Sequence, residues 1–145
     1  LKERERNMPN ITTNSVLFDG TEEEIQSIEK VFLDDDGKVT FNKIIPQPKD
    51  LFLGNLGDKE YEKYGEHNWY DWNCENWGTK WDAFESHAEV SEDKTALAVD
   101  FETAWAAPIP VAKKLKELFP SVIIDWTYHC EFDDQHHDLF EEDLV

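Results

Sequence analysis

A chain of 145 residues has the length of one ordinary domain, which buries about 70% of the surface that its unfolded chain exposes. Hydrophobic residues make up 39% of the chain and aromatic residues 13%, enough apolar area to exclude a disordered protein. The 33 acidic residues against 14 basic ones give a net charge of −19. We therefore expect no direct nucleic-acid binding, because this field repels phosphates.

The basic residues are distributed unevenly along the chain. Its only two arginines, Arg4 and Arg6, precede Met8, so the rest of the chain lacks the guanidinium fork that grips phosphates in two-point contacts. We expect residues 1–7 to be an added N-terminal extension, residues 8–130 to form one domain and residues 131–145 to form an acidic C-terminal tail. With no run of about 18 apolar residues and no signal-peptide pattern, the sequence predicts a cytoplasmic protein without membrane contact.

The first predicted elements are a strand, a helix and a second strand. Residues 11–18 alternate in polarity up to the turn Asp19-Gly20 and predict a strand. Thr21 and Glu24 form a capping box, and apolar residues at helical spacing behind them predict a helix over residues 21–33. The β-branched and aromatic run 39–45 predicts a second strand.

The rest of the chain predicts an insertion, a hairpin, a helix and a strand. Residues 49–80 lack a clean period and predict an insertion with a short helix at 58–64. Two runs, 81–90 and 95–102, flank a polar turn and predict a hairpin, and prolines delimit a helix at 109–119 before a last strand at 122–128. The order predicts an α+β fold, with a ferredoxin-like antiparallel sheet, two helices on one face, an extra strand and a Trp-rich insertion.

Four sequence motifs carry a resemblance to a known family. They are Met8-Pro9-Asn10 with Asn14, Phe41 with Ile45-Pro46-Gln47-Pro48, Asn76-Trp77-Gly78-Thr79-Lys80-Trp81-Asp82, and Phe101 with Thr103-Ala104-Trp105 and Pro108. In these segments the chain resembles the YubB-like ferredoxin-like family of phage and plasmid proteins. The resemblance implies a ferredoxin-like fold and a gene carried by mobile genetic elements. It implies no established activity and no catalytic residue. Residues 129–134 depart from the family pattern, which predicts a C-terminus adapted to this protein.

The metal-capable side chains near the C-terminus are His129, Cys130, His136 and His137. Zinc sites show short, regular ligand spacing, whereas this spacing is irregular. We therefore expect no metal and no cofactor, with Cys130 ending a strand and the histidines on a solvated tail. Cys74 and Cys130 are expected to be free thiols, with a disulfide as the alternative.

The Trp-rich stretch, residues 68–81, has two interpretations. Its four tryptophans, with the asparagines and Lys80 between them, present the groups that stack a planar ligand or a sugar ring. Aromatic residues in this number also build a core or brace a loop, because each buries a large area. We expect bracing, with Trp77, Trp81 and Trp105 mostly buried.

No motif predicts catalysis. The chain has no Gly-x-Ser-x-Gly elbow and no phosphate-binding loop, and neither cysteine lies in a recognisable nucleophile motif. The run Asp34-Asp35-Asp36-Gly37 lacks the alternate acids and the closing Glu of a calcium loop, so it predicts a helix end and a turn. We expect a protein that is not an enzyme.

The predicted function combines the acidity with the implied mobile-element origin. We expect an acidic nucleic-acid mimic that binds and inhibits a basic, nucleic-acid-binding host defence protein of the CRISPR or restriction type. Three alternatives stay open: a small-ligand or protein binding module using residues 68–81, acidity that serves only solubility, and an enzyme with an unrecognised motif. The predicted partner-binding acids are Glu22, Glu23, Glu24, Asp34, Asp35, Asp36, Asp133, Asp134, Asp138, Glu141, Glu142 and Asp143.

Overall fold

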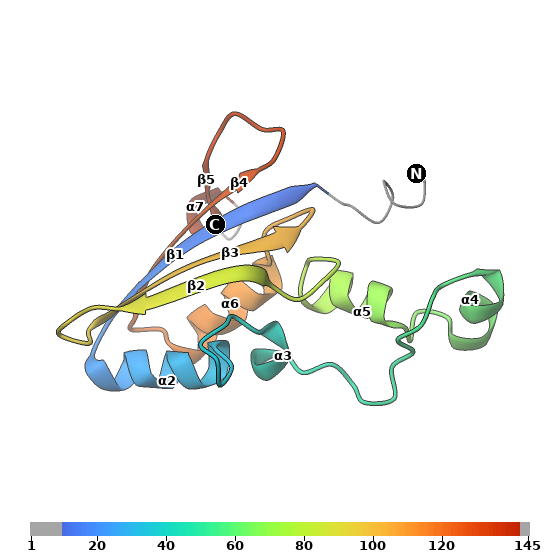
Figure 1. Cartoon of the computed structure of the whole chain (residues 1–145), viewed down its shortest axis with the longest axis horizontal. Helices are drawn as coiled ribbons and strands as arrows, with labels where there is room; N and C mark the ends of the chain where they lie inside the picture. Colours follow the sequence, from blue (N-terminus) through green and yellow to red (C-terminus); the bar gives the residue numbers. More distant parts are fainter. Residues whose placement is uncertain (1–9, 143–145) are drawn as a thin grey trace.

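The computed structural model describes residues 10–142 and shows a mixed α+β fold (Figure 1). Five strands form one antiparallel sheet in the order β2-β3-β1-β4-β5. The strands are β1 (Ile11–Asp19), β2 (Phe84–Val90), β3 (Ala96–Ala104), β4 (Ile123–Cys130) and β5 (His137–Asp138). The first predicted strand, the hairpin and the last predicted strand are confirmed.

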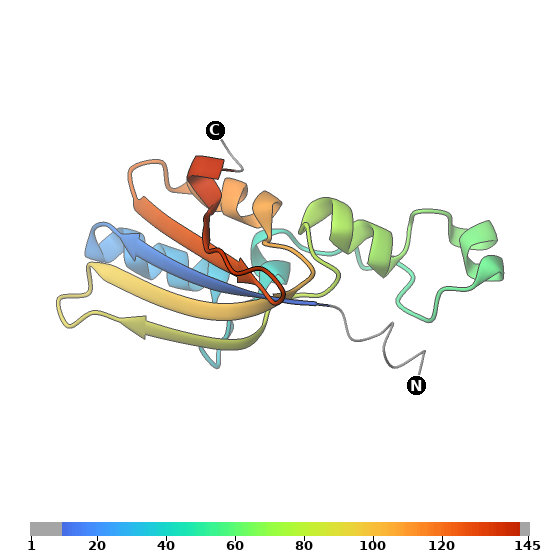
Figure 2. The same cartoon turned by 90° about the horizontal axis from the view of Figure 1, so that it is seen from above.

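Helices cover one side of this sheet (Figure 1). The two longest are α2 (Glu22–Phe32) and α6 (Ile109–Leu118), as predicted, and the short α3 (Phe41–Ile44) lies beside them. The insertion contains α4 (Asp58–Tyr64), also as predicted, and α5 (Trp69–Asn76), and it projects beyond one end of the sheet (Figure 2). The last helix is α7 (Leu139–Glu142). Among the described residues no helix has the length and apolar character needed to cross a membrane.

The core forms between the sheet and the helices because buried side chains alternate with more exposed ones along β1 and along most of β3. Phe32 of α2 lies at its centre and packs against four aromatic rings. Its ring centroid is 5.9 Å from that of Phe18, 6.0 Å from Phe101, 6.4 Å from Trp126 and 6.5 Å from Phe41. These rings fasten α2 and α3 to the middle of the sheet.

The capping box at the start of α2 is confirmed. The hydroxyl of Thr21 accepts a hydrogen bond from the Glu24 N–H at 3.1 Å, and the Glu24 carboxylate accepts one from the Thr21 N–H at 2.9 Å. Ile25, Ile28 and Phe32 are buried at helical spacing. Local hydrogen bonding and the apolar stripe therefore agree on the same helix.

The prediction of a second strand over residues 39–45 is wrong. Residues 41–44 form α3, in which Phe41 and Ile44 are both buried, and Val39 makes only an isolated bridge to Leu33. A short apolar run does not distinguish a strand from a buried helical turn by its period. The helix prevails because Phe41 and Ile44, three residues apart, reach the core together.

The additional strand of this sheet is β5, which follows β4 near the C-terminus. Thr127 pairs with Asp138, and Tyr128 pairs with His137. Leu139, the next residue, is 0% exposed and belongs to the hydrophobic core. Residues 137–142 therefore pack onto the domain.

Candidate functional site

The face of the sheet opposite α2 and α6 has an exposed surface. On β1 the outward side chains of Thr13, Ser15, Leu17 and Asp19 are all exposed. Cross-strand pairing places residues 102, 100, 98 and 96 of β3 and residues 129, 127, 125 and 123 of β4 beside them on the same side. We call this surface, together with residues 87 and 89 of β2, the open sheet face.

Five of the 14 positions of the open sheet face are acidic, and none of them is Lys or Arg. Neighbouring strands are about 4.8 Å apart and alternate residues along a strand about 6.7 Å apart, so these carboxylates form a two-dimensional array. Within the described part of the chain, none of them makes an ion pair. The five sheet-face acids are Asp19, Glu89, Asp100, Glu102 and Asp125.

The centre of the open sheet face combines the apolar side chain of Leu17 with polar neighbours. Leu17 is 44% exposed and lies between Ala98 of β3 and Asp125 of β4. A hollow of about 180 Å³ is lined by Ser15, Val16, Leu17, Asp125 and Thr127. This surface suits contact with a macromolecule better than enclosure of a small ligand.

The structure separates the predicted acids of α2 into two groups. Residues 22–24 form the first turn of the helix and residues 34–36 follow its last turn, about 18 Å away at 1.5 Å per residue. Two of these acids have local structural roles. Glu24 closes the capping box, and the Asp34 carboxylate accepts hydrogen bonds at 2.9 Å from the N–H groups of Asp36 and Lys38.

The predicted acids near the C-terminus lie at the β4–β5 edge. The Asp133 carboxylate is 2.7 Å from Nε2 of His137, and this hydrogen bond is the main cause that lowers the pKa of Asp133. Asp134 is exposed in the same loop, and Asp138 belongs to β5. Glu141 and Glu142 are in α7, and Asp143 lies outside the described residues.

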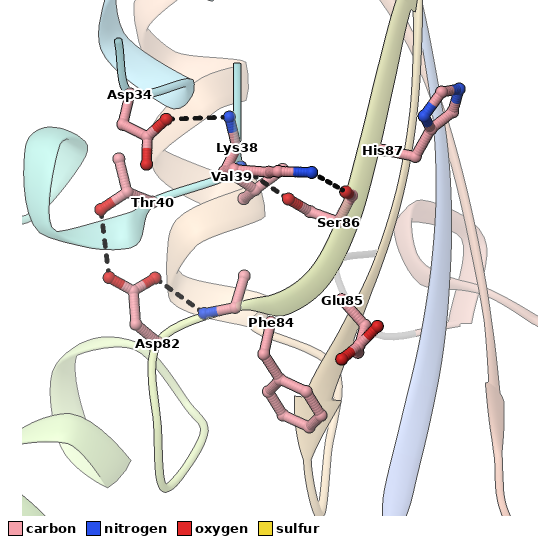
Figure 3. Close-up of a pocket in the computed structure, with 10 residues that line it drawn as sticks. Asp34, Lys38, Val39, Thr40, Asp82, Phe84, Glu85, Ser86 and His87 are labelled. Atoms are coloured by element: carbon pink, nitrogen blue, oxygen red, sulfur yellow. Dashed lines mark hydrogen bonds between the residues drawn. The ribbon is translucent and has the colours of Figure 1, made fainter. Parts of the chain in front are cut away.

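A hollow of about 700 Å³ lies beside β2 (Figure 3). Its polar groups are largely engaged with one another. The Val39 N–H donates to the Ser86 hydroxyl at 3.0 Å, and Lys38 Nζ donates to the Ser86 carbonyl at 3.3 Å. These bonds attach the α2–α3 connection to the edge strand and stabilise its bulged segment, where Glu85 has a φ of 48°.

Asp82, at the same hollow, has the perturbed acidity that often marks a functional carboxylate. Burial raises its pKa, while hydrogen bonds from Phe41 and Ala83 oppose that effect. Its two oxygens accept from the N–H groups of Phe41 and Ala83, both at 2.7 Å, and from the Thr40 hydroxyl at 3.1 Å. Through these contacts the Asp82 carboxylate caps the first N–H of α3. This structural role accounts for the burial of Asp82.

The histidines among the metal-capable side chains near the C-terminus stack on neighbouring rings. His129 stacks on His136 at 4.8 Å between centroids, Tyr128 stacks on His137 at 5.2 Å, and the Cys130 sulfur lies 3.4 Å from the Thr12 hydroxyl oxygen. Cys74 and Cys130 are free thiols. Over residues 10–142 no three His, Cys, Asp or Glu side chains gather as metal ligands.

The tryptophans divide into braces and surface residues. Trp77 is 2% exposed and donates from Nε1 to the Ile45 carbonyl at 2.9 Å, as the bracing interpretation predicts. Trp81 is partly buried, whereas Trp105 is 39% exposed, so the prediction for Trp105 is wrong. Its φ of 76° directs the chain away from β3 and leaves the indole at the surface.

Comparison with known proteins adds nothing to this geometry. No family model matches the chain, and neither a curated protein nor a solved structure matches it. The resemblance to the YubB-like family stays a prediction.

Proposed function

We propose that this protein has a ferredoxin-like fold and acts as an acidic nucleic-acid mimic, with the open sheet face as its binding surface. The order β1-α2-β2-β3-α6-β4 in the chain and β2-β3-β1-β4 in the sheet support the ferredoxin-like assignment. The partner is a basic protein that binds nucleic acid, of the host-defence class to which CRISPR effectors and restriction enzymes belong. Occupation of its basic channel inhibits it, without any catalysis by this protein.

The observation that carries this proposal is the unpaired array of carboxylates on the open sheet face. Lysines of the helical layer, Lys113, Lys114 and Lys116, belong to α6 on the other side of the sheet. These lysines lie away from the open sheet face, whose acids Asp100 and Asp125 make no ion pair within the described residues and can meet a partner's cations. A phosphate-binding channel presents an array of Lys and Arg, to which such a surface is complementary.

The binding energy comes from many weak contacts. An exposed ion pair contributes about 0.2–1 kcal/mol, so no single carboxylate decides the affinity. Acids beyond the open sheet face, among them Glu22, Glu23, Asp35 and Asp36, strengthen the field that steers the encounter. Salt at physiological ionic strength screens exposed charges beyond about 8 Å, so the complex weakens as salt rises.

A competition experiment tests the proposal. Bacterial lysate is bound to DNA- and RNA-bearing matrices, the protein is added, and released proteins are identified by mass spectrometry. The mimic releases a nucleic-acid-binding protein in low salt. Release that does not exceed that caused by an unrelated domain of equal net charge contradicts the proposal.

Two matched variants locate the surface. The sheet-face variant carries Asp19→Asn, Glu89→Gln, Asp100→Asn, Glu102→Gln and Asp125→Asn. The control variant has the same change in charge at five exposed acids elsewhere: Glu62, Glu66, Glu75, Glu92 and Glu117, each changed to Gln. The sheet-face variant loses the releasing activity and the control variant keeps it. Equal activity of the two variants contradicts the assignment of the open sheet face.

A further inference from the structure

A buried lysine lies between two tryptophan rings at the end of the Trp-rich stretch. Lys80 is 8% exposed, in the connection between α5 and β2. Its Nζ is 5.1 Å from the centroid of the Trp81 ring and 5.4 Å from that of Trp105. Trp105 also contacts Tyr70 of α5 edge to face, with 5.6 Å between the ring centroids.

Within the described residues the ammonium of Lys80 has no counter-ion. Among residues 10–142 it forms neither an ion pair nor a hydrogen bond, although the protein carries a net charge of −19. Burial raises the pKa of the Cys74 thiol and that of the Tyr70 phenol, so both groups are neutral at pH 7. The cation–π contacts with the two rings stabilise the ammonium but supply no counter-charge.

The two indole rings that contact Lys80 also have N–H groups without an acceptor among residues 10–142. Trp69, Trp77 and Trp126 each donate from Nε1 to an oxygen of the protein. Within the described residues Trp81 and Trp105 make no such bond. No side-chain nitrogen or oxygen of the buried and partly buried described residues is both sealed from solvent and unpaired, so the Trp81 N–H and the Lys80 ammonium reach solvent, and Trp105 is itself 39% exposed.

The backbone holds Trp105 in place at an energetic cost. Its φ of 76° lies in the left-handed region, which a bulky residue rarely adopts. Two hydrogen bonds maintain it: the Trp105 N–H donates to the Asn10 carbonyl at 2.8 Å, and the Trp105 carbonyl accepts from the Thr12 hydroxyl at 3.1 Å. The strained residue keeps an exposed indole next to an uncompensated ammonium.

We propose that Lys80, Trp81, Trp105 and Tyr70 form a binding site for a small planar carboxylate. The carboxylate supplies the missing counter-charge to Lys80 and accepts from a free indole N–H, while the planar group packs against the exposed Trp105 ring. This site is independent of the open sheet face and of the proposed mimicry. The protein binds the ligand without chemical change.

Benzoate is the probe, and the uncharged benzamide is its matched control. The indole N–H signals of the 15N-labelled protein are followed by NMR during titration with each compound. Benzoate shifts the Trp81 and Trp105 signals saturably, and benzamide binds at least about tenfold more weakly because it lacks the charge-assisted contact. Absence of saturable shifts at millimolar benzoate, or equal binding of the two compounds, overturns the proposal.

Three variants separate the site from the fold. Lys80→Met keeps the apolar stem without the ammonium, and benzoate affinity falls at least about tenfold. Trp105→Gly relieves the left-handed strain, so it folds while losing benzoate binding. Lys113→Met removes an exposed lysine of α6 and leaves the affinity unchanged. If Lys80→Met and Trp105→Gly both bind benzoate with wild-type affinity, these residues only brace the insertion. That result overturns the proposal.

Discussion

The Asp82 carboxylate accepts a hydrogen bond of 2.7 Å from the Phe41 N–H, which ties the start of β2 to the start of α3 across 41 residues of sequence. Asp82→Ala leaves this N–H unpaired and should lower the free energy of unfolding by about 1–3 kcal/mol. Asp82→Asn should be milder, because an amide oxygen still accepts from Phe41 and the Thr40 hydroxyl accepts from the new NH₂. Denaturant unfolding of both variants checks this order. Equal stability of Asp82→Ala and wild type would contradict it.

The ionisation of Asp82 should make stability depend on pH. Burial raises its pKa above the ordinary value of 3.8. The folded protein then binds the Asp82 proton more tightly than the unfolded chain does. The contribution of this proton to the free energy of unfolding is therefore fully present below pH 3.8 and is lost as pH rises through the raised pKa. The free energy of unfolding of wild type minus that of Asp82→Asn should therefore decrease as pH rises from about 3 to about 7. A difference that stays constant or increases would show that the carboxyl ionises without penalty.

The capping box should contribute measurably to α2. Thr21→Ala removes the acceptor for the Glu24 N–H and should cost about 0.5–2 kcal/mol. Thr21→Ser keeps a hydroxyl and should stay close to wild type, which makes it the matched control. Thermal unfolding of the two variants measures the difference. Indistinguishable melting temperatures would mean that solvent replaces the cap.

A buried chain of side-chain hydrogen bonds centred on Asn14 should contribute measurably to stability. Trp126 Nε1 donates to the Asn14 side-chain oxygen at 3.1 Å, and the Asn14 amide donates to the Thr103 hydroxyl at 3.0 Å. Asn14→Ala should cost about 1–3 kcal/mol for each buried group that it leaves unpaired. Ser15→Ala, on the exposed side of the same strand, should change stability by less than about 0.5 kcal/mol. Chemical denaturation tests both, and similar values for the two variants would contradict the role of Asn14.

Elements with strong local signals were predictable from the sequence. The Thr21–Glu24 pair and the stripe that ends at Phe32 specify one helix, so propensity and packing agree. Residues 39–45 lacked such agreement, because the N–H of Phe41 is satisfied by Asp82, a partner distant in sequence. A local pattern does not contain that information.

The candidate sites were less predictable for a similar reason. Runs of acids such as residues 34–36 are conspicuous in sequence, whereas the open sheet face collects five acids that are separated in sequence and come from four strands. The alternation of Asp100 and Glu102 with buried Val99 and Phe101 was the available signal, because period two places both acids on one face. The exposure of Trp105 depends on a left-handed φ that its residue type disfavours, so no pattern predicts it.

The most direct test of the central claim measures affinity against salt. A protein released from the nucleic-acid matrix is purified, and its dissociation constant is determined for wild type, the sheet-face variant and the control variant at several salt concentrations. We predict that wild type and the control variant bind tightly in low salt and lose affinity steeply as salt rises, whereas the sheet-face variant binds weakly throughout. Three coincident curves that are flat in salt would contradict the account.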